Sequence, residues 1–180
     1  YRVISTAGRR GSGGGGSGQL ALQIRVRQTT LDDLDTVVAF NAAMARETEG
    51  KELDLARLRA GVEAVLGDAS RGFYLVAEIP PTPLSQRGVR GDLQVVGQLL
   101  VTTEWSDWRN AFFWWVQSVY VAPHYRRRGV YRALDSYLRA EALRRSDVCG
   151  LRLYVARTNR VARRCMLIWG WSAPTTICTR

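Results

Sequence analysis

The sequence has little histidine, little cysteine and almost no lysine. His124 is the only histidine, and the three cysteines, Cys149, Cys165 and Cys178, form no CxxC pair. Because a zinc site needs several such ligands at close spacing, we expect no metal centre. Free thiols in a reducing compartment are expected in place of disulfides. Of the 26 basic residues only Lys51 is a lysine, so arginine carries the positive charge.

Long hydrophobic runs are also missing. The longest strongly apolar run, 111–116, is far shorter than the ~20 residues that cross a bilayer, so we expect no membrane span and no membrane partner. The composition is 46% hydrophobic and 23% charged over 180 residues. These values predict one globular domain with a sizeable core.

The positive charge is concentrated in the last third of the chain. Residues 1–120 hold 13 basic and 13 acidic side chains, whereas residues 121–180 hold 13 basic and 3 acidic ones. A local field of this kind favours an anionic partner. On charge alone, nucleic acid, an anionic membrane surface and a polyphosphate cofactor are all candidates, although we expect no membrane partner. A coding bias explains the preference for arginine over lysine, but it does not explain this segregation.

The first 22 residues are rich in glycine, serine and arginine and contain no acidic residue. Such a composition cannot form a core, so we expect a flexible tail over 1–22 and a folded domain over 23–180. Acid-poor leaders with arginine and serine also resemble organellar transit sequences, and both interpretations stay open. The expected compartment is the cytoplasm, or an organelle interior such as the plastid if the tail is a transit remnant.

Hydrophobic periodicity predicts alternating strands and helices over the rest of the chain. The expected strands are 23–27, 73–78, 93–103, 112–121, 151–155 and 175–178. The expected helices are 30–49, 53–66, 130–144 and 159–168. This order predicts an α/β (α+β) fold with a mixed, mostly antiparallel sheet flanked by about four helices.

The most informative segment runs from Val119 through an arginine cluster to a helix. Pro123 ends the strand, and Gly129 precedes the helix. A helix N-terminus offers backbone N–H groups and a partial positive charge, Gly129 allows tight backbone geometry, and arginine side chains add charge. The segment therefore predicts a phosphate site, although an ordinary strand–turn–helix with a solvated basic turn has the same pattern.

This segment resembles the cofactor motif of GNAT acetyltransferases, which is Arg or Gln, two residues, Gly, one residue, then Gly or Ala. Arg126, Gly129 and Tyr131 occupy those places, and Tyr131 departs from the usual small residue. The resemblance implies acetyl-CoA as co-substrate, with its pantetheine arm paired to the preceding strand. The implied cofactor-binding residues are Val119, Val121, Arg126, Arg127, Arg128, Gly129, Val130, Tyr131, Arg132 and Asn159.

A second block supports the resemblance. Asn159, Ala162, Met166 and the run 169–171 stand at the offsets of the family's Asn, Ala, Tyr and Leu-Gly-aromatic positions. The family's usual acid is the tyrosine at the place of Met166, and methionine cannot donate a proton. Three alternatives follow: the leaving thiolate needs no acid, Tyr154 or Cys165 replaces the tyrosine, or the protein has lost activity.

Four acidic residues are candidates for the acceptor site. Glu104 ends an expected strand and is the candidate base, with Asp107 close by, although both also fit a solvated turn. Glu47 and Glu49 end the first expected helix, which in the family forms one wall of the acceptor site. There they would attract an amine, although taken singly each also fits a plain acidic turn. The four together favour N-acetylation of a small polar or amino-acid-like amine.

The aromatic run 112–115 should place one pair of rings on each face of its strand, mainly in the core. Two rival functions remain. A nucleic-acid-binding module fits the basic last third, but the aromatic residues lie mainly outside that segment and no binding motif is present, which argues against it. An acetyl-CoA-binding protein with weak or lost catalysis is the other. As for protein partners, a homodimer is compatible with the sequence.

Overall fold

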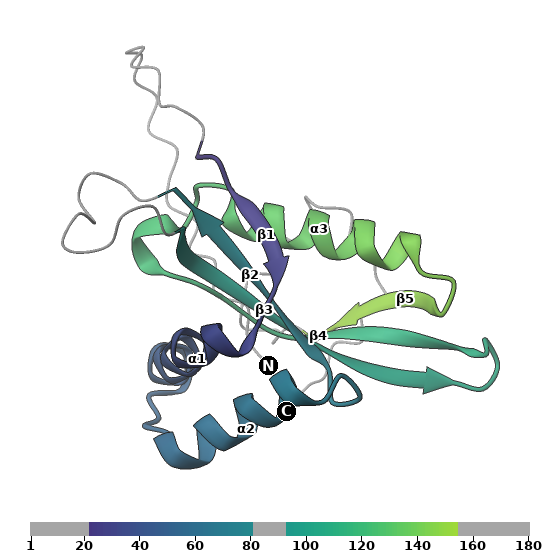
Figure 1. The fold of residues 1–180 in the computed structure, drawn as a ribbon, viewed down its shortest axis with the longest axis horizontal. Helices are drawn as coiled ribbons and strands as arrows, with labels where there is room; N and C mark the ends of the chain where they lie inside the picture. Colours follow the sequence, from purple (N-terminus) through teal and green to yellow (C-terminus); the bar gives the residue numbers. More distant parts are fainter. Residues whose placement is uncertain (1–21, 81–92, 155–180) are drawn as a thin grey trace, which may run out of the picture.

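A computed structural model of the protein describes residues 22–80 and 93–154 (Figure 1). In these residues five strands form one sheet in the order β1-β2-β3-β4-β5; β1 to β4 are antiparallel to one another, and β5 runs parallel to β4. The strands are β1 (Arg25–Gln28), β2 (Phe73–Ile79), β3 (Gln94–Ser106), β4 (Ala111–Val121) and β5 (Val148–Leu153). The helical elements are η1 (Leu31–Asp33), α1 (Leu34–Glu49), α2 (Leu55–Gly67), η3 (Pro123–Tyr125) and α3 (Val130–Arg144).

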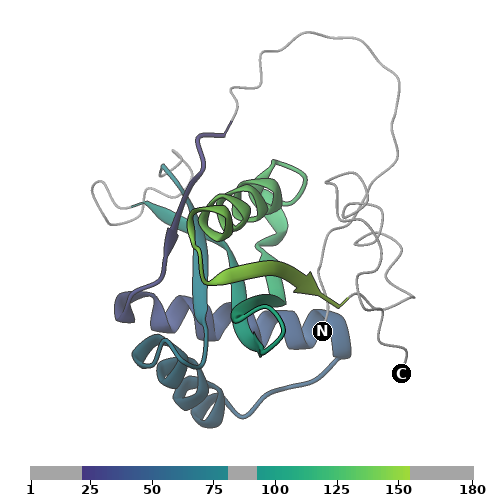
Figure 2. The same ribbon diagram turned by 90° about the vertical axis from the view of Figure 1, so that its right-hand side faces the viewer.

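The helices cover both faces of the sheet. Figures 1 and 2 show α3 along one face and α1 with α2 on the other, and we call these the α3 face and the α1–α2 face. The larger core lies on the α3 face, where Leu134 and Leu138 of α3 are fully buried against the strands. On the opposite face Val37 of α1 and Val62 of α2 are buried together with Tyr74 of β2.

The helix ends follow local sequence signals. Asp54 caps α2, because its carboxylate accepts hydrogen bonds from the backbone N–H groups of Ala56 and Arg57 at 3.0 and 3.1 Å. Gly50 ends α1 with φ 62°, in the left-handed region that glycine adopts at little cost. The expected ends of α2 lie within two residues of the observed ones. The first helix ends where expected, but its expected start is divided into η1 and α1, which begins at Leu34.

The expected fold class is confirmed, but β3 extends further than expected, and β5 is shifted toward the N-terminus and ends at Leu153. β3 continues from Thr103 to Ser106 because its pairing with β4 extends to the hairpin turn. β5 begins at Val148, three residues early, because its pairing with β4 starts there. The helix expected at 159–168 and the strand expected at 175–178 lie outside the described residues. Within the described ranges, no helix is both long and apolar enough to cross a bilayer.

Candidate active site

β4 and β5 separate halfway along β4. Their pairing joins Phe112–Val116 to Val148–Leu153 and ends there, whereas β4 continues to Val121 beside β3. In the part of the chain that the structure describes, the outer edge of β4 from Ser118 onward therefore has no strand partner. The β3–β4 register skips Gln117, so a bulge lies where the strands part. Such an open edge can accept an extended ligand as an added strand.

The arginine turn, residues 126–129, joins η3 to α3. Arg127 has φ 63° and Gly129 has φ 89°, both in the left-handed region. Alternating backbone conformations of this kind direct successive N–H groups toward one side, which makes an anion-binding concavity. Gly129 is the N-cap of α3 and has no side chain to cover the helix end. The first bond of the helix runs from the N–H of Ala133 to the carbonyl of Gly129 at 3.0 Å. The turn thus presents the positive end of α3 to an anion.

Gly97 allows α3 to begin close to the sheet. A Cβ at Gly97 would lie 2.9 Å from Cγ1 of Val130 and 3.1 Å from the carbonyl oxygen of Tyr120. Val130, the first residue of α3, is only 1% exposed, so the helix start packs directly on β3. The sequence analysis missed Gly97. A glycine inside an apolar strand was the available signal, because it indicates a close approach by another element.

The side chain of Arg126 points toward α1. Its Nε donates to the carbonyl oxygen of Val121 at 2.9 Å, and its terminal nitrogen lies 2.5 Å from a carboxylate oxygen of Glu47. The side chain is only 14% exposed. Because Glu47 lies in the last turn of α1, this ion pair ties the arginine turn to the helix expected to form the acceptor wall.

Tyr120 contacts the same carboxylate. Its hydroxyl donates to the second oxygen of Glu47 at 2.8 Å, and its ring packs 5.1 Å from that of Phe40. Burial, followed by the hydrogen bond and charge of Glu47, raises the pKa of Tyr120 to about 12. The hydroxyl therefore stays protonated at neutral pH and acts as a donor. Both oxygens of Glu47 are engaged, one by Tyr120 and the other by Arg126.

Glu104 lies inside β3 on the α1–α2 face, not in a turn. The indole N–H of Trp115 donates to one carboxylate oxygen, and Arg152 of β5 lies 2.9 Å from the other. The ring of Tyr154 stacks on Trp115, with centroids 4.5 Å apart and an interplanar angle of 21°. The two predicted catalytic residues, Glu104 and Tyr154, therefore meet at the same tryptophan. The predicted alternation of the aromatic run puts Trp115 on this face.

Two guanidinium groups lie over the ring of Phe113, beside Glu104. The guanidinium carbon of Arg152 is 3.4 Å from the ring centroid, and that of Arg109 is 5.2 Å away. Arg109 lies in the β3–β4 turn, where Asn110 has φ 48°. Within the described ranges no carboxylate forms an ion pair with Arg109. This end of the α1–α2 face thus has two cations and one paired carboxylate.

The other predicted acceptor residues make local contacts. Asp107 is exposed in the hairpin turn and accepts the N–H of Trp108 at 2.8 Å. Glu49 is exposed and pairs with Lys51 at 2.8 Å. The structure does not bring either residue to Glu104 through these contacts. Asn159, and likewise Cys165 and Met166, lie outside the described residues.

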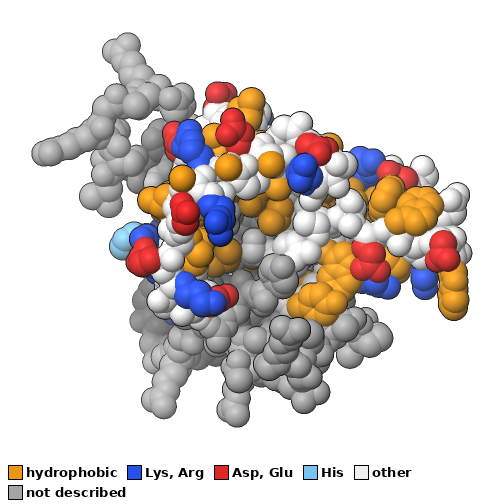
Figure 3. Space-filling view, turned by 90° about the horizontal axis from the view of Figure 1, so that it is seen from below, with side chains coloured by type: hydrophobic (Ala, Val, Ile, Leu, Met, Phe, Trp, Pro, Cys, Tyr) orange, Lys and Arg blue, Asp and Glu red, His pale blue; other side chains and the backbone are white. Residues whose placement is uncertain are grey.

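Figure 3 shows the described surface on the side of α2 and the projecting hairpin. Basic and acidic side chains are interspersed there, and hydrophobic side chains gather on the hairpin. Trp105 and Trp108 of this hairpin are 51% and 92% exposed. Among the described residues no group of three or more potential ligands gathers around a metal site.

The sequence and the fold resemble known acetyltransferases. Residues 67–171 match the model of the Acetyltransferase (GNAT) family. A possible acetyltransferase from Clostridium difficile 630 has 40% sequence identity and a TM-score of 0.70, over 81% of this chain and 88% of that one. A search of curated proteins gives no match.

More distant solved structures share the fold. An aminoglycoside N-acetyltransferase, AAC(6')-Iy, solved in complex with CoA, has 11% identity and a TM-score of 0.65, over 90% of this chain and 96% of that one. A ribosomal-protein-alanine N-acetyltransferase from Brucella melitensis biovar Abortus 2308 has 19% identity and a TM-score of 0.61, over 87% and 98%. At such identities the likeness concerns the fold alone, and the named acceptors differ widely.

Proposed function

Because the chain belongs to the GNAT acetyltransferase family, we propose that it transfers an acetyl group from acetyl-CoA to the amine of a small polar or amino-acid-like acceptor. The observation that carries the proposal is the open edge of β4 leading to the arginine turn at the start of α3. An extended amide arm fits the first feature and a pyrophosphate fits the second.

The backbone around Val119 supports the cofactor position. Ala122 donates its N–H to Val96 of β3 at 2.9 Å, so the carbonyl of Val121 points away from β3, toward the open edge. Because strand residues two apart face the same way, the backbone groups of Val119 point there too. The carbonyl of Val121 already accepts Nε of Arg126, so Val119 is the better partner for the pantetheine arm.

Phosphate binding would fall to the backbone of 126–132 and to exposed arginines. Arg127, Arg128 and Arg132 are exposed around the helix start, whereas Arg126 is directed inward. We therefore propose that Arg126 orders the turn and that the three exposed arginines attract the phosphates. Val130 and Tyr131 would contribute through their positions in the first turn of α3. The role of Asn159 remains a prediction from the family motif.

Glu104 and Tyr154, which both contact Trp115, support the proposed acetyl transfer. Acetyl-CoA supplies an activated acyl group. Its leaving group is a thiolate, and a thiol with a pKa of ~8.5 is a fair leaving group at neutral pH. The amine nitrogen bonds to the thioester carbonyl carbon, the carbon–sulfur bond breaks, and sulfur leaves as the thiolate. Glu104 would accept the first ammonium proton, directly or through water, and Tyr154 would give a proton to the sulfur. The second nitrogen proton, lost as the amide forms, would restore the proton of Tyr154. Holding both reactants in line supplies much of the rate.

The acceptor would lie on the α1–α2 face. Glu104 is a carboxylate suited to an amine, and Trp115 and Phe113 offer aromatic surfaces beside it. Glu49 and Asp107, the more exposed carboxylates at the margins, would attract a cationic amine before it binds. Glu47 has both oxygens engaged, so we propose that it contributes more to ordering the wall than to direct contact.

The test measures thiol release from acetyl-CoA by the full chain against a panel of diamines, amino sugars and free amino acids. Acetylated products are identified by mass spectrometry. We expect amine-dependent release with at least one class, and coenzyme A binding by calorimetry. Absence of coenzyme A binding would overturn the whole proposal.

Weak or lost catalysis is a second candidate, and one observation favours it. Both oxygens of Glu104 are engaged by Trp115 and Arg152, which leaves the carboxylate less free to accept a proton. This candidate expects normal coenzyme A binding with no amine-dependent thiol release across the panel.

A further inference from the structure

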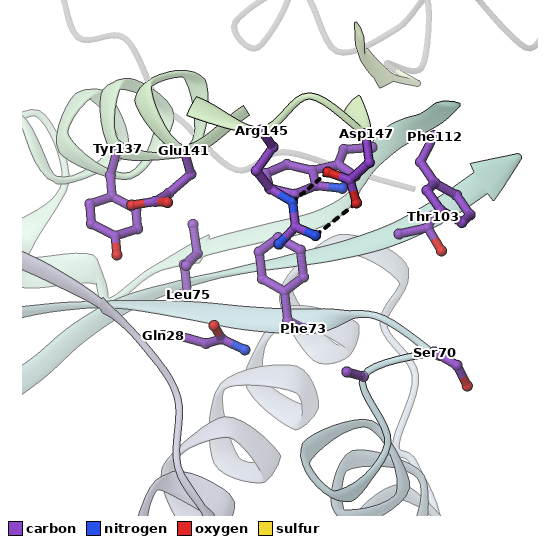
Figure 4. Close-up of a pocket in the computed structure, with 12 residues that line it drawn as sticks. Gln28, Ser70, Phe73, Leu75, Thr103, Phe112, Tyr137, Glu141, Arg145 and Asp147 are labelled. Atoms are coloured by element: carbon purple, nitrogen blue, oxygen red, sulfur yellow. Dashed lines mark hydrogen bonds and ion pairs between the residues drawn. The ribbon is translucent and has the colours of Figure 1, made fainter. Parts of the chain in front are cut away.

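A cavity opens on the α3 face, away from the proposed acetyl-transfer site (Figure 4). It has a volume of about 390 Å³ and lies between the last turns of α3 and the ends of β2, β3 and β4. Thr103 lines it, whereas the next residue, Glu104, points to the opposite face, as alternation along a strand requires. Glu141 stands about 18 Å along α3 from Gly129, far from the arginine turn.

Four aromatic side chains line the cavity. Phe73 and Trp114 meet edge to face, with centroids 5.0 Å apart and an interplanar angle of 72°. Phe112 and Tyr137 also line the space, and Figure 4 shows Tyr137 hanging from α3 above the strands. A cavity of this size with aromatic walls suits a small flat molecule, because rings pack on one another edge to face or offset-stacked.

Each charged group of the wall has an ion-pair partner, either in the wall or beside it. Arg145 donates two hydrogen bonds to Asp147, each of 2.8 Å, drawn as dashed lines in Figure 4. Glu141 forms an ion pair with Arg144. A charged ligand would have to compete with these internal pairs and lose part of its hydration. A neutral ligand would leave both pairs intact.

The remaining polar groups are neutral. The hydroxyl of Tyr137 stays protonated, because burial and the neighbouring Glu141 raise its pKa. The amide of Gln28 and the hydroxyl of Thr103 stand at the exposed rim. These groups can donate to or accept from a single polar substituent on a ring.

From this arrangement we propose that the α3-face cavity is a binding site for an uncharged, planar aromatic molecule. The site is separate from the acetyl-transfer site and does not depend on the proposed reaction. Aromatic packing supplies the affinity, the neutral rim orients the ligand, and the two internal ion pairs select against charge.

Three probes with the same ring test the charge selection: 3-methylindole is neutral, tryptamine is a cation and indole-3-acetate is an anion. Binding to the full chain is measured by ligand-observed NMR titration. We expect saturable binding of 3-methylindole, and binding about tenfold or more weaker for the two charged probes, a difference of about 1.4 kcal/mol. Equal binding of all three probes, or no saturable binding of 3-methylindole, would overturn the proposal.

Two cavity-filling variants test the location. Thr103→Trp fills the space from β3, and Ser70→Trp fills it from the turn before β2. Arg25→Trp, at the exposed start of β1 and outside the wall, is the matched control. Circular dichroism establishes that each variant is folded, and either filled variant suffices if the other does not fold. We expect 3-methylindole binding to weaken about tenfold or more in the filled variants and to persist in the control. Unchanged binding in a folded filled variant contradicts the site.

Discussion

Arg126 and Glu47 form an ion pair across 79 positions of the sequence, joining the turn that precedes α3 to the last turn of α1. The same arginine holds the carbonyl of Val121, and the same glutamate accepts the hydroxyl of Tyr120. The proposed cofactor turn and the proposed acceptor wall are therefore one connected unit. A substitution in the acceptor wall should therefore alter the conformation of the cofactor turn.

The first prediction concerns Glu47→Gln. The variant replaces the ion pair with Arg126 by a weaker, neutral hydrogen bond. The arginine turn is then less ordered before coenzyme A binds. We expect the Kd for coenzyme A to rise about threefold to tenfold, or about 1 kcal/mol, measured by calorimetry. Glu49→Gln, on the same helix end but paired with Lys51, is the control and should leave the Kd unchanged. Equal effects of the two variants would argue against the connection.

The second prediction concerns Gly129→Ala. A Cβ at this position has room, since the nearest atoms are a terminal nitrogen of Arg132 at 3.8 Å and Cδ1 of Ile24 at 3.9 Å. The cost is therefore backbone conformation, because φ is 89°. We expect a loss of about 1–2 kcal/mol in the free energy of unfolding, with coenzyme A binding about tenfold weaker.

Gly61→Ala is the matched control for that variant. Gly61 lies inside α2, where a Cβ would meet nothing within 4 Å. Since alanine is the better helix former, the control should gain about 0.5–1 kcal/mol in the free energy of unfolding and leave coenzyme A binding unchanged. If Gly129→Ala changes neither the free energy of unfolding nor the Kd for coenzyme A more than Gly61→Ala does, the positive φ of Gly129 is not required for the cofactor turn.

Local signals in the sequence predicted that the five described strands exist, where most helices end, and the turn at Gly129, because each depends on a few neighbouring residues. The contacts of Glu104 with Arg152 and of Glu47 with Arg126 could not be predicted in the same way. The first contact depends on the register of β5 against β4, and the second depends on where α1 crosses the sheet. The bulge at Gln117 likewise arises from pairing and not from composition.

The third prediction distinguishes the contribution of Glu104 to kcat from that of its neighbour Arg152. Glu104→Gln keeps the shape but removes the proton acceptor, so kcat should fall about 100-fold on the best amine of the panel. Arg152→Gln removes the ion pair that orients Glu104, together with the cation–π contact with Phe113, and we expect a smaller loss, about tenfold.

Asp107→Asn is the control, since Asp107 is exposed in the turn and contacts only its local backbone in the pairs described above. Its kcat should stay near that of the unchanged protein. An unchanged kcat in Glu104→Gln would remove Glu104 as the base.

A largely buried charge network ties β1 to η1 and β2, away from the proposed sites. Arg27 bonds both oxygens of Asp33, at 2.7 and 2.9 Å, and also contacts Glu78 at 2.6 Å. Burial acts most strongly on Asp33 and would raise its pKa. The hydrogen bonds from Arg27 and from the N–H of Thr30 together outweigh burial, so the pKa lies below the usual value.

The fourth prediction follows from the sign of that shift. A carboxyl whose pKa is lower in the folded protein stabilises the fold above its unfolded pKa of ~3.9, and this stabilisation is lost as pH falls through the folded pKa. Asp33→Asn should lower the free energy of unfolding at pH 7 by about 2–3 kcal/mol. This is less than the loss expected when a fully buried ion pair is broken, because the side chain of Arg27 is 30% exposed.

Urea titrations of both proteins at several pH values check this, and the gap between them should shrink below about pH 4 as Asp33 itself becomes protonated. Asp35→Asn, at an exposed position paired with Arg59, should have a much smaller effect across the range. A gap for Asp33→Asn that stays constant down to pH 2 would show that packing of the amide, and not the ionised carboxylate, determines the stability of this network.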